Sequence, residues 1–481
     1  MRISVVIRYI GIILLVLAAF MLMSAGIAYV SNVDSSYYPL VMSSLLTLLL
    51  GCFPLIFVPT PNSISTKEGY CIVVGSWLVS SVVGMFPYLM WGGEFTVINA
   101  WFESVSGFTT TGASILNNIE ALPRGLLFWR MATCWIGGVG VVMFALIILP
   151  SIGRSKRMLS SVELSSLAKD NFNYRTQTIV RIILITYFLV TAVTTIGLKL
   201  AGMCWFDALC HAMSACSTCG FSTKNTSIAF FNSGLIEFVL IVAMCIAGLH
   251  FGLIYATVTG KHNNVFRSEV SRVYFTIIGV SSVLIAISLW LSDIYPTLWL
   301  SLRSALFHTV SLFTTTGFAT VDCNTWTSFA ILILIFCSIV CGCAGSTSGG
   351  LKVNRFLVAA KMIRTRLRAQ RHPDAIFRTK IDGVVQDEDM MGVVMVYIVA
   401  YMLLILIGTF LNTLFGADLM TGFSAAVSCV SNVGPGFGEV GTMANYSLMP
   451  IVTKFNLTVL MLLGRLEIFG LIQLFFIRWW R

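Results

Sequence analysis

Four short strings of small and hydroxyl-bearing residues recur along the chain, and each one ends on a glycine. A serine stands six residues before every glycine, and a threonine or serine stands three residues before it. Because glycine adopts backbone angles that other residues avoid, such a string can turn successive carbonyl oxygens toward one point. Carbonyl oxygens arranged in this way can replace the hydration shell of a cation. The strings are Ser106-Gly-Phe-Thr-Thr-Thr-Gly112, Ser214-Ala-Cys-Ser-Thr-Cys-Gly220, Ser311-Leu-Phe-Thr-Thr-Thr-Gly317 and Ser428-Cys-Val-Ser-Asn-Val-Gly434.

The fourfold repetition of the strings is stronger evidence for a pore structure than any single copy. One Thr-Thr-Thr-Gly is an ordinary polar loop, but four copies at intervals of about one hundred residues predict a repeated structural unit. Before each string lies an apolar segment that is too short to cross a bilayer. We expect these segments to be re-entrant helices whose carboxyl ends, with their partial negative charge, face a common axis. They lie near residues 100–108, 208–216, 305–313 and 422–430.

The composition places these repeats in a membrane. Of the 481 residues, 57% are hydrophobic and only 10% are charged, which excludes a water-soluble globular fold. The basic and then apolar amino end lacks a clear cleavage site, which favours a retained first helix over a signal peptide. Apolar runs and loop charges together predict about ten spans. Runs of spanning length include residues 10–28, 40–58, 182–198 and 391–411.

We therefore predict an all-α polytopic membrane protein with four tandem repeats of membrane helix, pore loop and membrane helix around a pseudo-fourfold pore. Two extra transmembrane helices precede the repeats. Non-helical backbone inside a bilayer is tolerated only where it is buried or lines a watery path, so the four strings imply a central pore. The predicted units are 1–66 for the leading helices, then 67–153, 154–262, 263–380 with a broken second helix, and 381–481 for the four pore repeats.

The net charge of +10 indicates a membrane face and not a nucleic-acid site, because the basic residues gather in particular connections. The richest stretches are 154–175 and 361–380, whereas the connections between them carry few positive charges. The positive-inside rule then puts both termini in the cytoplasm. Both a protein partner and anionic membrane lipid are compatible with this basic surface.

The candidate ion ligands are the three residues that close each string. Their hydroxyl and small side chains keep a pore lining narrow and polar, while their backbone supplies the oxygens. These residues are Thr110, Thr111, Gly112, Thr218, Cys219, Gly220, Thr315, Thr316, Gly317, Asn432, Val433 and Gly434.

A candidate gate follows the third string. The second span of that repeat, from near Ser328, contains four glycines within residues 341–350, so we expect the helix to break near mid-depth. A flexible polar break beside a pore suits a gate; the alternative is a packing kink, as we interpret Gly137, Gly138 and Gly140. The candidate gate residues are Gly345, Ser346, Thr347, Ser348, Gly349, Gly350 and Arg465.

Arg465 belongs to this set because it lies deep in the last apolar run, 450–480. A charge there is costly unless it meets a partner or water, so Arg465 is either a structural ion pair or a cation barrier in the pore. Glu467 is two positions on and should pair with another segment, because residues two apart do not face each other on a helix. Lys454, near the outer end, is expected to extend to the membrane surface.

Three polar residues occupy one equivalent position, nine residues before the string glycine. His211 and His308 are expected to hold the re-entrant helices through hydrogen bonds, and Glu103 is a candidate counter-charge near the outer mouth. The thirteen cysteines are scattered through apolar segments, which predicts neither a disulfide framework nor a metal site.

The sequence carries no pattern typical of an enzyme. It has no phosphate-binding loop, no dinucleotide fingerprint and no acidic metal cluster, so it predicts no organic cofactor. A secondary active symporter, coupling the cation to protons or sodium, is the main rival to a pore. Such transporters usually contain inverted repeats, whereas the charge bias gives these four repeats the same orientation.

Over nearly its whole length the chain resembles the Trk/Ktr/HKT superfamily of potassium transporters, whose filters are built from four non-identical repeats. The leading helix pair and three stretches are most similar to the bacterial TrkH branch. The second and fourth strings depart from the pattern, with Cys219 in one and Asn432 and Val433 in the other. The three stretches are Trp135-Ile-Gly-Gly-Val-Gly140, residues 341–350 and Asn432-Val-Gly-Pro-Gly-Phe-Gly438.

The resemblance implies potassium uptake across the bacterial cytoplasmic (inner) membrane, with potassium as the transported ion. A glycine at the first filter position, here Gly112, accompanies potassium selectivity in this family, while a serine there accompanies sodium preference. The resemblance also implies a homodimer, a cytosolic nucleotide-binding regulatory subunit of the RCK type (TrkA-like), and a pore arginine, here Arg465.

Overall fold

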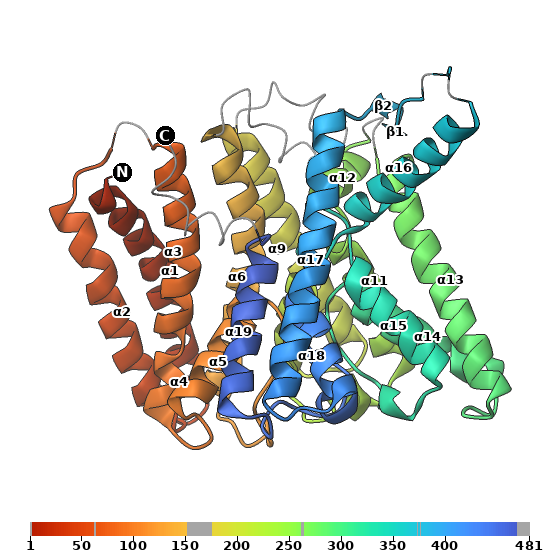
Figure 1. Ribbon diagram of the computed structural model, residues 1–481. Helices are drawn as coiled ribbons and strands as arrows, with labels where there is room; N and C mark the ends of the chain where they lie inside the picture. The colour runs from red at the N-terminus through yellow and green to blue at the C-terminus, as the bar shows by residue number, and fades with distance from the viewer. Residues whose placement is uncertain are drawn as a thin grey trace.

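A computed structural model describes residues 2–61, 64–151, 176–260, 264–372, 374–375 and 377–468 (Figure 1). Helices make up almost all of its regular structure, as the apolar composition predicts. One short antiparallel pair, β1 (Lys380–Ile381) and β2 (Val384–Val385), is the exception within the described residues. The prediction of an all-α membrane fold is confirmed.

The first six helices are two leading helices and the first repeat. They are α1 (Ile3–Val30), α2 (Tyr37–Phe57), α3 (Thr66–Gly84), α4 (Phe86–Trp91), α5 (Val97–Phe108) and α6 (Arg124–Ser151). The second repeat contains α9 (Thr176–Leu200), α10 (Trp205–Ser217), α11 (Gly234–Ala247) and α12 (Phe251–Val258). The third contains α13 (Glu269–Leu291), α14 (Leu298–Phe313), α15 (Ser328–Val340) and α16 (Val353–Arg371), and the fourth α17 (Glu388–Leu414), α18 (Leu419–Ser431) and α19 (Ile451–Arg465).

Six described helical stretches are long and apolar enough to cross a membrane, and the bent pair α11 and α12 makes a seventh. α6, the pair α15 and α16, and α19 are the helices left for the other three of the predicted ten spans, and their crossing of the membrane stays a prediction. The six stretches are Ile3–Val30, Tyr37–Phe57, Lys67–Trp91, Arg181–Leu200, Glu269–Leu291 and Glu388–Leu414.

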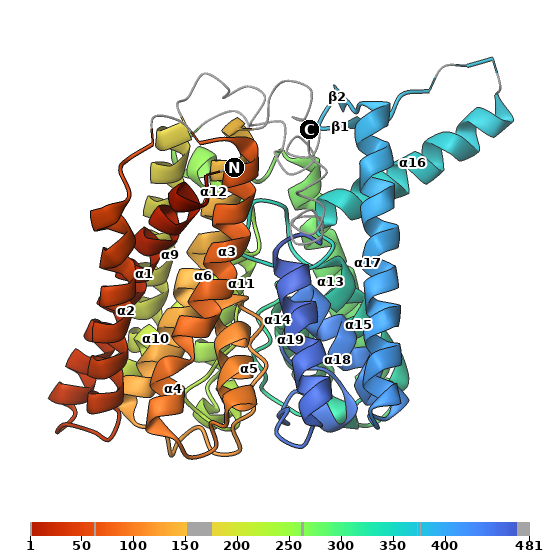
Figure 2. The same ribbon diagram turned by 60° about the vertical axis from the view of Figure 1, so that its left-hand side comes forward.

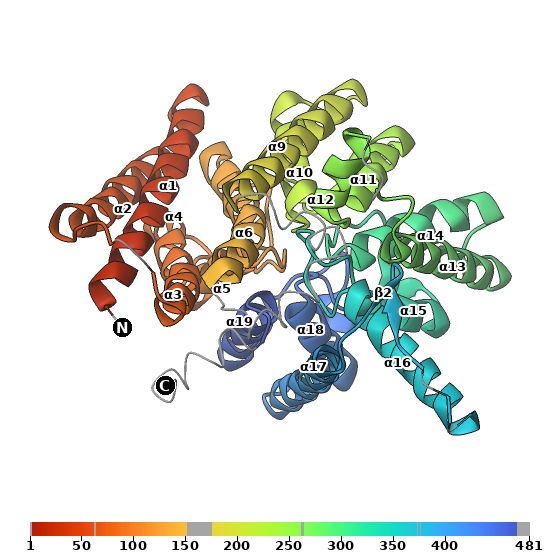
Figure 3. The same cartoon turned by 90° about the horizontal axis from the view of Figure 1, so that it is seen from above.

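The four repeats lie around a common centre. Seen from above, their helices form four groups that follow one another around that centre, and α1 and α2 pack outside the first group (Figure 3). The leading pair crosses closely because small residues meet there: a methyl group on Gly11 would lie 2.8 Å from the Gly51 carbonyl oxygen. Most residues of the short helices α5, α10, α14 and α18 are buried.

Two second spans are broken. The expected break in repeat three lies between α15 and α16, and α16 projects outward from the bundle at the end where α1 begins (Figures 1 and 2). The second repeat also breaks: α11 and α12 meet at 104°, a bend that the sequence analysis missed. Both breaks face the centre, so each contributes irregular backbone there.

Candidate functional site

Each glycine string follows the carboxyl end of a short helix. The helices α5, α10, α14 and α18 begin a few residues earlier than expected, because a capping side chain precedes each one. Thr96, Cys204, Thr297 and Asp418 each accept a hydrogen bond from a backbone N–H of the first turn. Since the carbonyl ends of the helices face the strings, their dipoles favour a cation there.

The four strings share one backbone conformation. The residue two before each glycine is left-handed, with φ values of 52°, 55°, 60° and 56° at Thr110, Thr218, Thr315 and Asn432. The next N–H donates to the carbonyl of the recurrent serine, for example from Thr111 to Ser106 at 2.8 Å and from Val433 to Ser428 at 2.9 Å. The shared turn therefore places the residue before the glycine in the same way in all four repeats, while the glycine φ is 80° to 84° in three strings and 103° in the fourth.

The strings meet in a closed ring. A methyl group on Gly112 would lie 1.7 Å from the Cys219 carbonyl oxygen, and one on Gly220 would lie 1.8 Å from that of Thr316. The same holds for Gly317 against Val433, at 2.3 Å, and for Gly434 against Thr111, at 2.5 Å. Each repeat thus touches the next, and the fourth touches the first. No side chain larger than hydrogen fits at these four positions without displacing a neighbour's backbone.

The twelve residues proposed from the sequence as ion ligands are the ones that form this ring, and we call them the carbonyl ring. Of their twelve carbonyl oxygens, only that of Gly434 accepts a hydrogen bond from the described residues. Most of these residues are buried, and buried carbonyls in proteins are nearly always paired. Eleven oxygens are therefore available to another ligand.

Buried charged and aromatic side chains pack around the carbonyl ring on its outer side. Glu103 of α5 is fully buried and pairs with Arg130 of α6 at 2.6 Å. Arg130 also donates to the Ser222 carbonyl at 2.9 Å and lies over the ring of Phe221, so it joins repeats one and two. The prediction of Glu103 as a counter-charge at the outer mouth is wrong, because Arg130 neutralises this carboxylate inside the protein.

The two histidines act as expected from their position. His211 Nδ1 donates to the Asp207 carbonyl at 2.7 Å, so its Nε2 accepts from the Ser222 hydroxyl at 2.9 Å. His308 Nε2 accepts from the backbone N–H of Thr320 at 3.4 Å. Each imidazole thus ties its short helix to the chain just beyond the ring glycine.

The loop in the broken third span, residues 345–350, lies against the helix ends beneath the ring. The Thr347 hydroxyl donates to the Cys216 carbonyl at 3.0 Å, and the Gly349 N–H donates to the Thr315 hydroxyl at 3.1 Å. A methyl group on Gly349 would lie 2.3 Å from the Ser431 carbonyl oxygen. We call residues 345–350 the gate loop; it contacts repeats two and four as well as its own.

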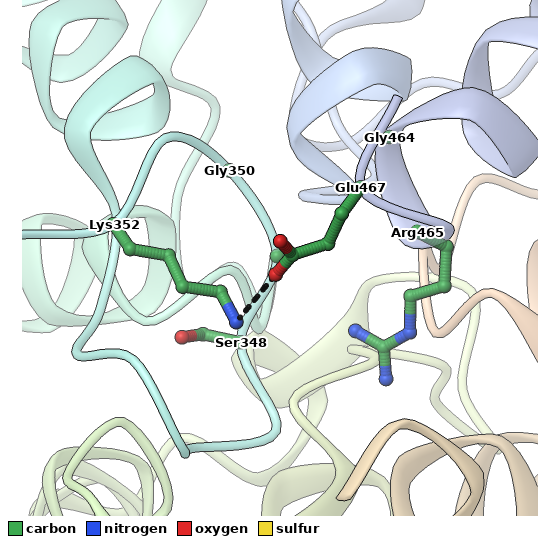
Figure 4. Close-up of a pocket in the computed structure, with 7 residues that line it drawn as sticks. Ser348, Gly350, Lys352, Gly464, Arg465 and Glu467 are labelled. Carbon is green, nitrogen blue, oxygen red and sulfur yellow. Dashed lines mark ion pairs between the residues drawn. The ribbon is translucent and has the colours of Figure 1, made fainter. Parts of the chain in front are cut away.

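Arg465 lies beside the gate loop. One of its terminal nitrogens donates to the Thr347 carbonyl at 2.8 Å, while Nε and the other terminal nitrogen have no partner among the described residues. Its side chain is only 4% exposed. A cavity of about 10 Å³, room for roughly one water molecule, is lined by both elements (Figure 4).

Glu467 points away from Arg465, as predicted. Figure 4 shows its carboxylate directed at Lys352, and the ion pair measures 3.5 Å. Arg355 pairs with the same carboxylate at 2.5 Å. The end of α19 is thus joined to the start of α16 by charge, and Arg465 pairs with no carboxylate among the described residues.

Two expectations about the last span are wrong. The helix does not run on from 450 toward 480: α19 ends at Arg465, where Glu467 and Ile468 take left-handed φ values of 54° and 47°. Residues 469–481 lie outside the described residues. Lys454 does not extend to the surface; it is 5% exposed, and its ammonium donates to Asn99 and to the Ser447 carbonyl. The Lys454 side chain is therefore bound by Asn99 of repeat one.

The sequence analysis missed the role of the second break. The Gly248 carbonyl accepts a hydrogen bond from the Cys343 N–H at 2.9 Å, and the Phe251 N–H donates one to the Gly345 carbonyl at 3.2 Å. The bend of repeat two thus binds the break in the third span. The signal was present as two glycines that flank His250, within Gly248-Leu-His-Phe-Gly252. Gly137, Gly138 and Gly140, interpreted from the sequence as a packing kink, all lie within the single helix α6. The packing part of that interpretation fits the structure, because a methyl group on Gly137 would lie 2.0 Å from the Phe108 carbonyl oxygen.

Comparison with known proteins agrees with this architecture. The family model TrkH, described as a cation transport protein, matches residues 54–479. The chain belongs to the TrkH cation transport family. It is 34% identical over 426 residues to "Trk system potassium uptake protein TrkH" of Salmonella typhimurium, covering 87% of each. It is 32% identical to "Trk system potassium uptake protein TrkG" of Escherichia coli, covering 86% of each.

A solved structure gives the same picture for this TrkH-family fold. The crystal structure of the potassium transporter TrkH from Vibrio parahaemolyticus superposes with a TM-score of 0.90 at 29% identity, covering 100% of both chains. The predicted four-repeat fold and the predicted family are therefore confirmed, and the chain is a multi-pass membrane protein.

Proposed function

We propose that this chain takes up potassium across the bacterial cytoplasmic membrane, and that the carbonyl ring is its selectivity filter. The observation that carries the proposal is the closed ring of four glycine strings whose buried carbonyl oxygens, eleven of twelve, accept no hydrogen bond from the described residues. Such oxygens are stabilised when a dehydrated cation takes the place of the missing donors.

Potassium is the ion we assign to the ring. Glycine occupies the closing position in all four strings, so no side chain narrows the ring or interrupts its oxygens. The chain's relatives are named potassium uptake proteins. The function we assign is transport and not catalysis, and we assign no organic cofactor to this chain.

We propose that the gate loop and Arg465 close this path beneath the filter. The loop touches the helix ends of three repeats, and Arg465 brings an unpaired positive charge to the same place. A loop rich in glycine has several accessible backbone conformations, so movement of α16 can shift it. Coupling of potassium to protons or sodium is the rival mechanism.

We also propose the assembly and orientation. The chain forms a homodimer, and both of its termini lie in the cytoplasm. Its units are the leading helices 1–66 and the four pore repeats 67–153, 154–262, 263–380 and 381–481. Its cytoplasmic face docks an RCK-type regulator. Arg364, Arg366 and Arg368 are exposed on α16 and offer a basic docking surface; the other basic stretch, 154–175, lies outside the described residues. Loss of regulator capture on charge reversal of these three arginines supports docking, whereas unchanged capture removes this surface from the proposal.

The filter is tested by placing a side chain in the ring. Gly112→Ser should lower the preference for potassium over sodium, because a side chain there meets the Cys219 carbonyl. The matched control is Gly279→Ser on α13, where a methyl group meets nothing within 4 Å. Permeability ratios are measured in sealed vesicles that contain the purified protein. An unchanged ratio in folded Gly112→Ser protein would remove Gly112 from the filter.

The same vesicles separate the two mechanisms. Potassium flux driven by a potassium gradient alone, without proton or sodium gradients, supports a passive pore. Flux that requires one of those gradients supports the symporter. Binding is measured independently of flux, since potassium should raise the Tm of the detergent-solubilised protein more than sodium does if it binds the native ring.

A further inference from the structure

The carbonyl ring is not fourfold symmetric. Three of its glycines have φ values of 80° to 84° and are partly exposed, whereas Gly434 has a φ of 103° and is buried. The carbonyls of Gly112, Gly220 and Gly317 accept no hydrogen bond from the described residues. That of Gly434 accepts one from the Tyr446 hydroxyl at 2.8 Å. One oxygen of the ring is therefore tethered by a side chain from outside the ring.

Tyr446 is held firmly at the junction between repeats four and one. It is 2% exposed, its N–H donates to the Ser114 carbonyl at 2.8 Å, and its ring packs against Phe102 with centroids 5.4 Å apart. Ser114 lies two residues after Gly112, so Tyr446 connects the ring segments of both repeats. Its hydroxyl cannot shift without disturbing the packing of the pore helix α5.

The residue after Gly434 adds to the constraint. Pro435 has a fixed φ and restricts the backbone of the preceding residue. In the other three repeats this position is Ala113, Phe221 or Phe318. The fourth string thus departs from the others both in its backbone and in its support.

We propose that Tyr446 is a positioning residue that sets potassium over sodium discrimination by tethering the Gly434 carbonyl. This inference rests on the proposed role of the ring as the filter. A ring contracts around a smaller ion only if its oxygens can move inward. A hydroxyl that holds one oxygen on the outer side opposes that contraction, and it also makes the tethered oxygen a weaker ligand.

The test replaces only the hydroxyl. Tyr446→Phe should lower the potassium-to-sodium permeability ratio about fivefold, the change expected for loss of one typical hydrogen bond. The matched control is Tyr88→Phe: Tyr88 is also fully buried, but its hydroxyl has no partner among the described residues. The control should leave the ratio unchanged. A purely structural role for Tyr446 would lower the flux of both ions together without altering their ratio.

Parallel variants separate this inference from the proposed function. If Gly112→Ser alters the ratio and Tyr446→Phe does not, the tether is wrong and the filter stands. If neither alters it, the filter itself is wrong. Should Tyr446→Phe fail to insert, a difluorotyrosine at position 446 keeps the ring and makes the hydroxyl a stronger donor. The ratio should then rise, and an unchanged or lower ratio overturns the tether.

Discussion

Removing the charge of Arg465 should raise potassium flux. The guanidinium is almost fully buried, and it donates to the Thr347 carbonyl of the gate loop at 2.8 Å. Glu467 does not neutralise it, because that carboxylate pairs with Lys352 and Arg355. On the proposed path, a cation that passes the gate loop meets a positive charge that no carboxylate compensates and a carbonyl that already accepts a hydrogen bond.

The magnitude follows from this geometry. A unit charge at about 4 Å opposes a monovalent cation by roughly 4 kcal/mol when the effective dielectric constant is near 20. Any water that enters this cavity would screen part of the repulsion. Even one quarter of it, about 1 kcal/mol, corresponds to roughly a fivefold change in rate. Loss of the guanidinium also frees the Thr347 carbonyl, which acts in the same direction.

Three substitutions separate the charge from the hydrogen bond. Arg465→Ala removes both, Arg465→Gln keeps a donor without charge, and Arg465→Lys keeps the charge. If charge is the barrier, we expect the Ala and Gln variants to conduct at least fivefold faster, while the Lys variant stays close to the parent. Arg364→Ala, on the exposed face of α16, controls for loss of a positive charge elsewhere.

The assay is rubidium uptake into sealed vesicles at matched protein content, with a potassium gradient as the driving force. Insertion and folding are checked by Tm for each variant. If the Gln variant, folded and inserted, conducts no faster than the parent, the electrostatic barrier is refuted. If only the Ala variant is faster, the hydrogen bond to the gate loop and not the charge provides the closure.

Three further outcomes are expected. Arg130→Ala should lower the free energy of unfolding by about 3 to 5 kcal/mol, because it leaves the buried Glu103 carboxylate without its countercharge, and the double variant with Glu103→Gln should recover part of this loss in a thermal melt. Lys454→Met should lower stability by about 1 to 2 kcal/mol through loss of its hydrogen bond to Asn99, a loss that surface exposure of Lys454 would not cause. Gly349→Ala should raise flux in the vesicle assay, since the added methyl group displaces the gate loop from the backbone of repeat four; a folded variant with parental flux would contradict the close contact.

The sequence predicted the parts of the site that repeat. Four matching strings imply four matching backbones, and the common hydrogen bond to the recurrent serine shows why: the turn is local, so it is encoded within seven residues. The third-span break was equally local, because four glycines in ten residues cannot sustain a helix. Arg465 was found because charge in an apolar run is conspicuous.

The parts that were missed depend on pairs distant in sequence. Nothing near Lys454 indicates that Asn99 will accept its hydrogen bond, and nothing near Glu103 names Arg130 as its partner. The bend after Ala247 was overlooked because α11 reads as an uninterrupted apolar span. The bend frees the Gly248 carbonyl to accept a hydrogen bond from the Cys343 N–H of the next repeat, a contact that the sequence does not indicate.

Because the carbonyl ring is made from one chain, its four repeats can make different contacts, both at the ring itself and beneath it. On one side, Tyr446 tethers the carbonyl of repeat four and leaves the other three glycine carbonyls without such a bond. Below, the gate loop bonds to the helix end of repeat two and lies against that of repeat four, while Arg465 of repeat four holds it. A ring of identical subunits would have to change all four sides together. We propose that here one loop, joined to helix α16, which is linked to the end of α19 through Glu467, opens a path while the carbonyl ring keeps its geometry.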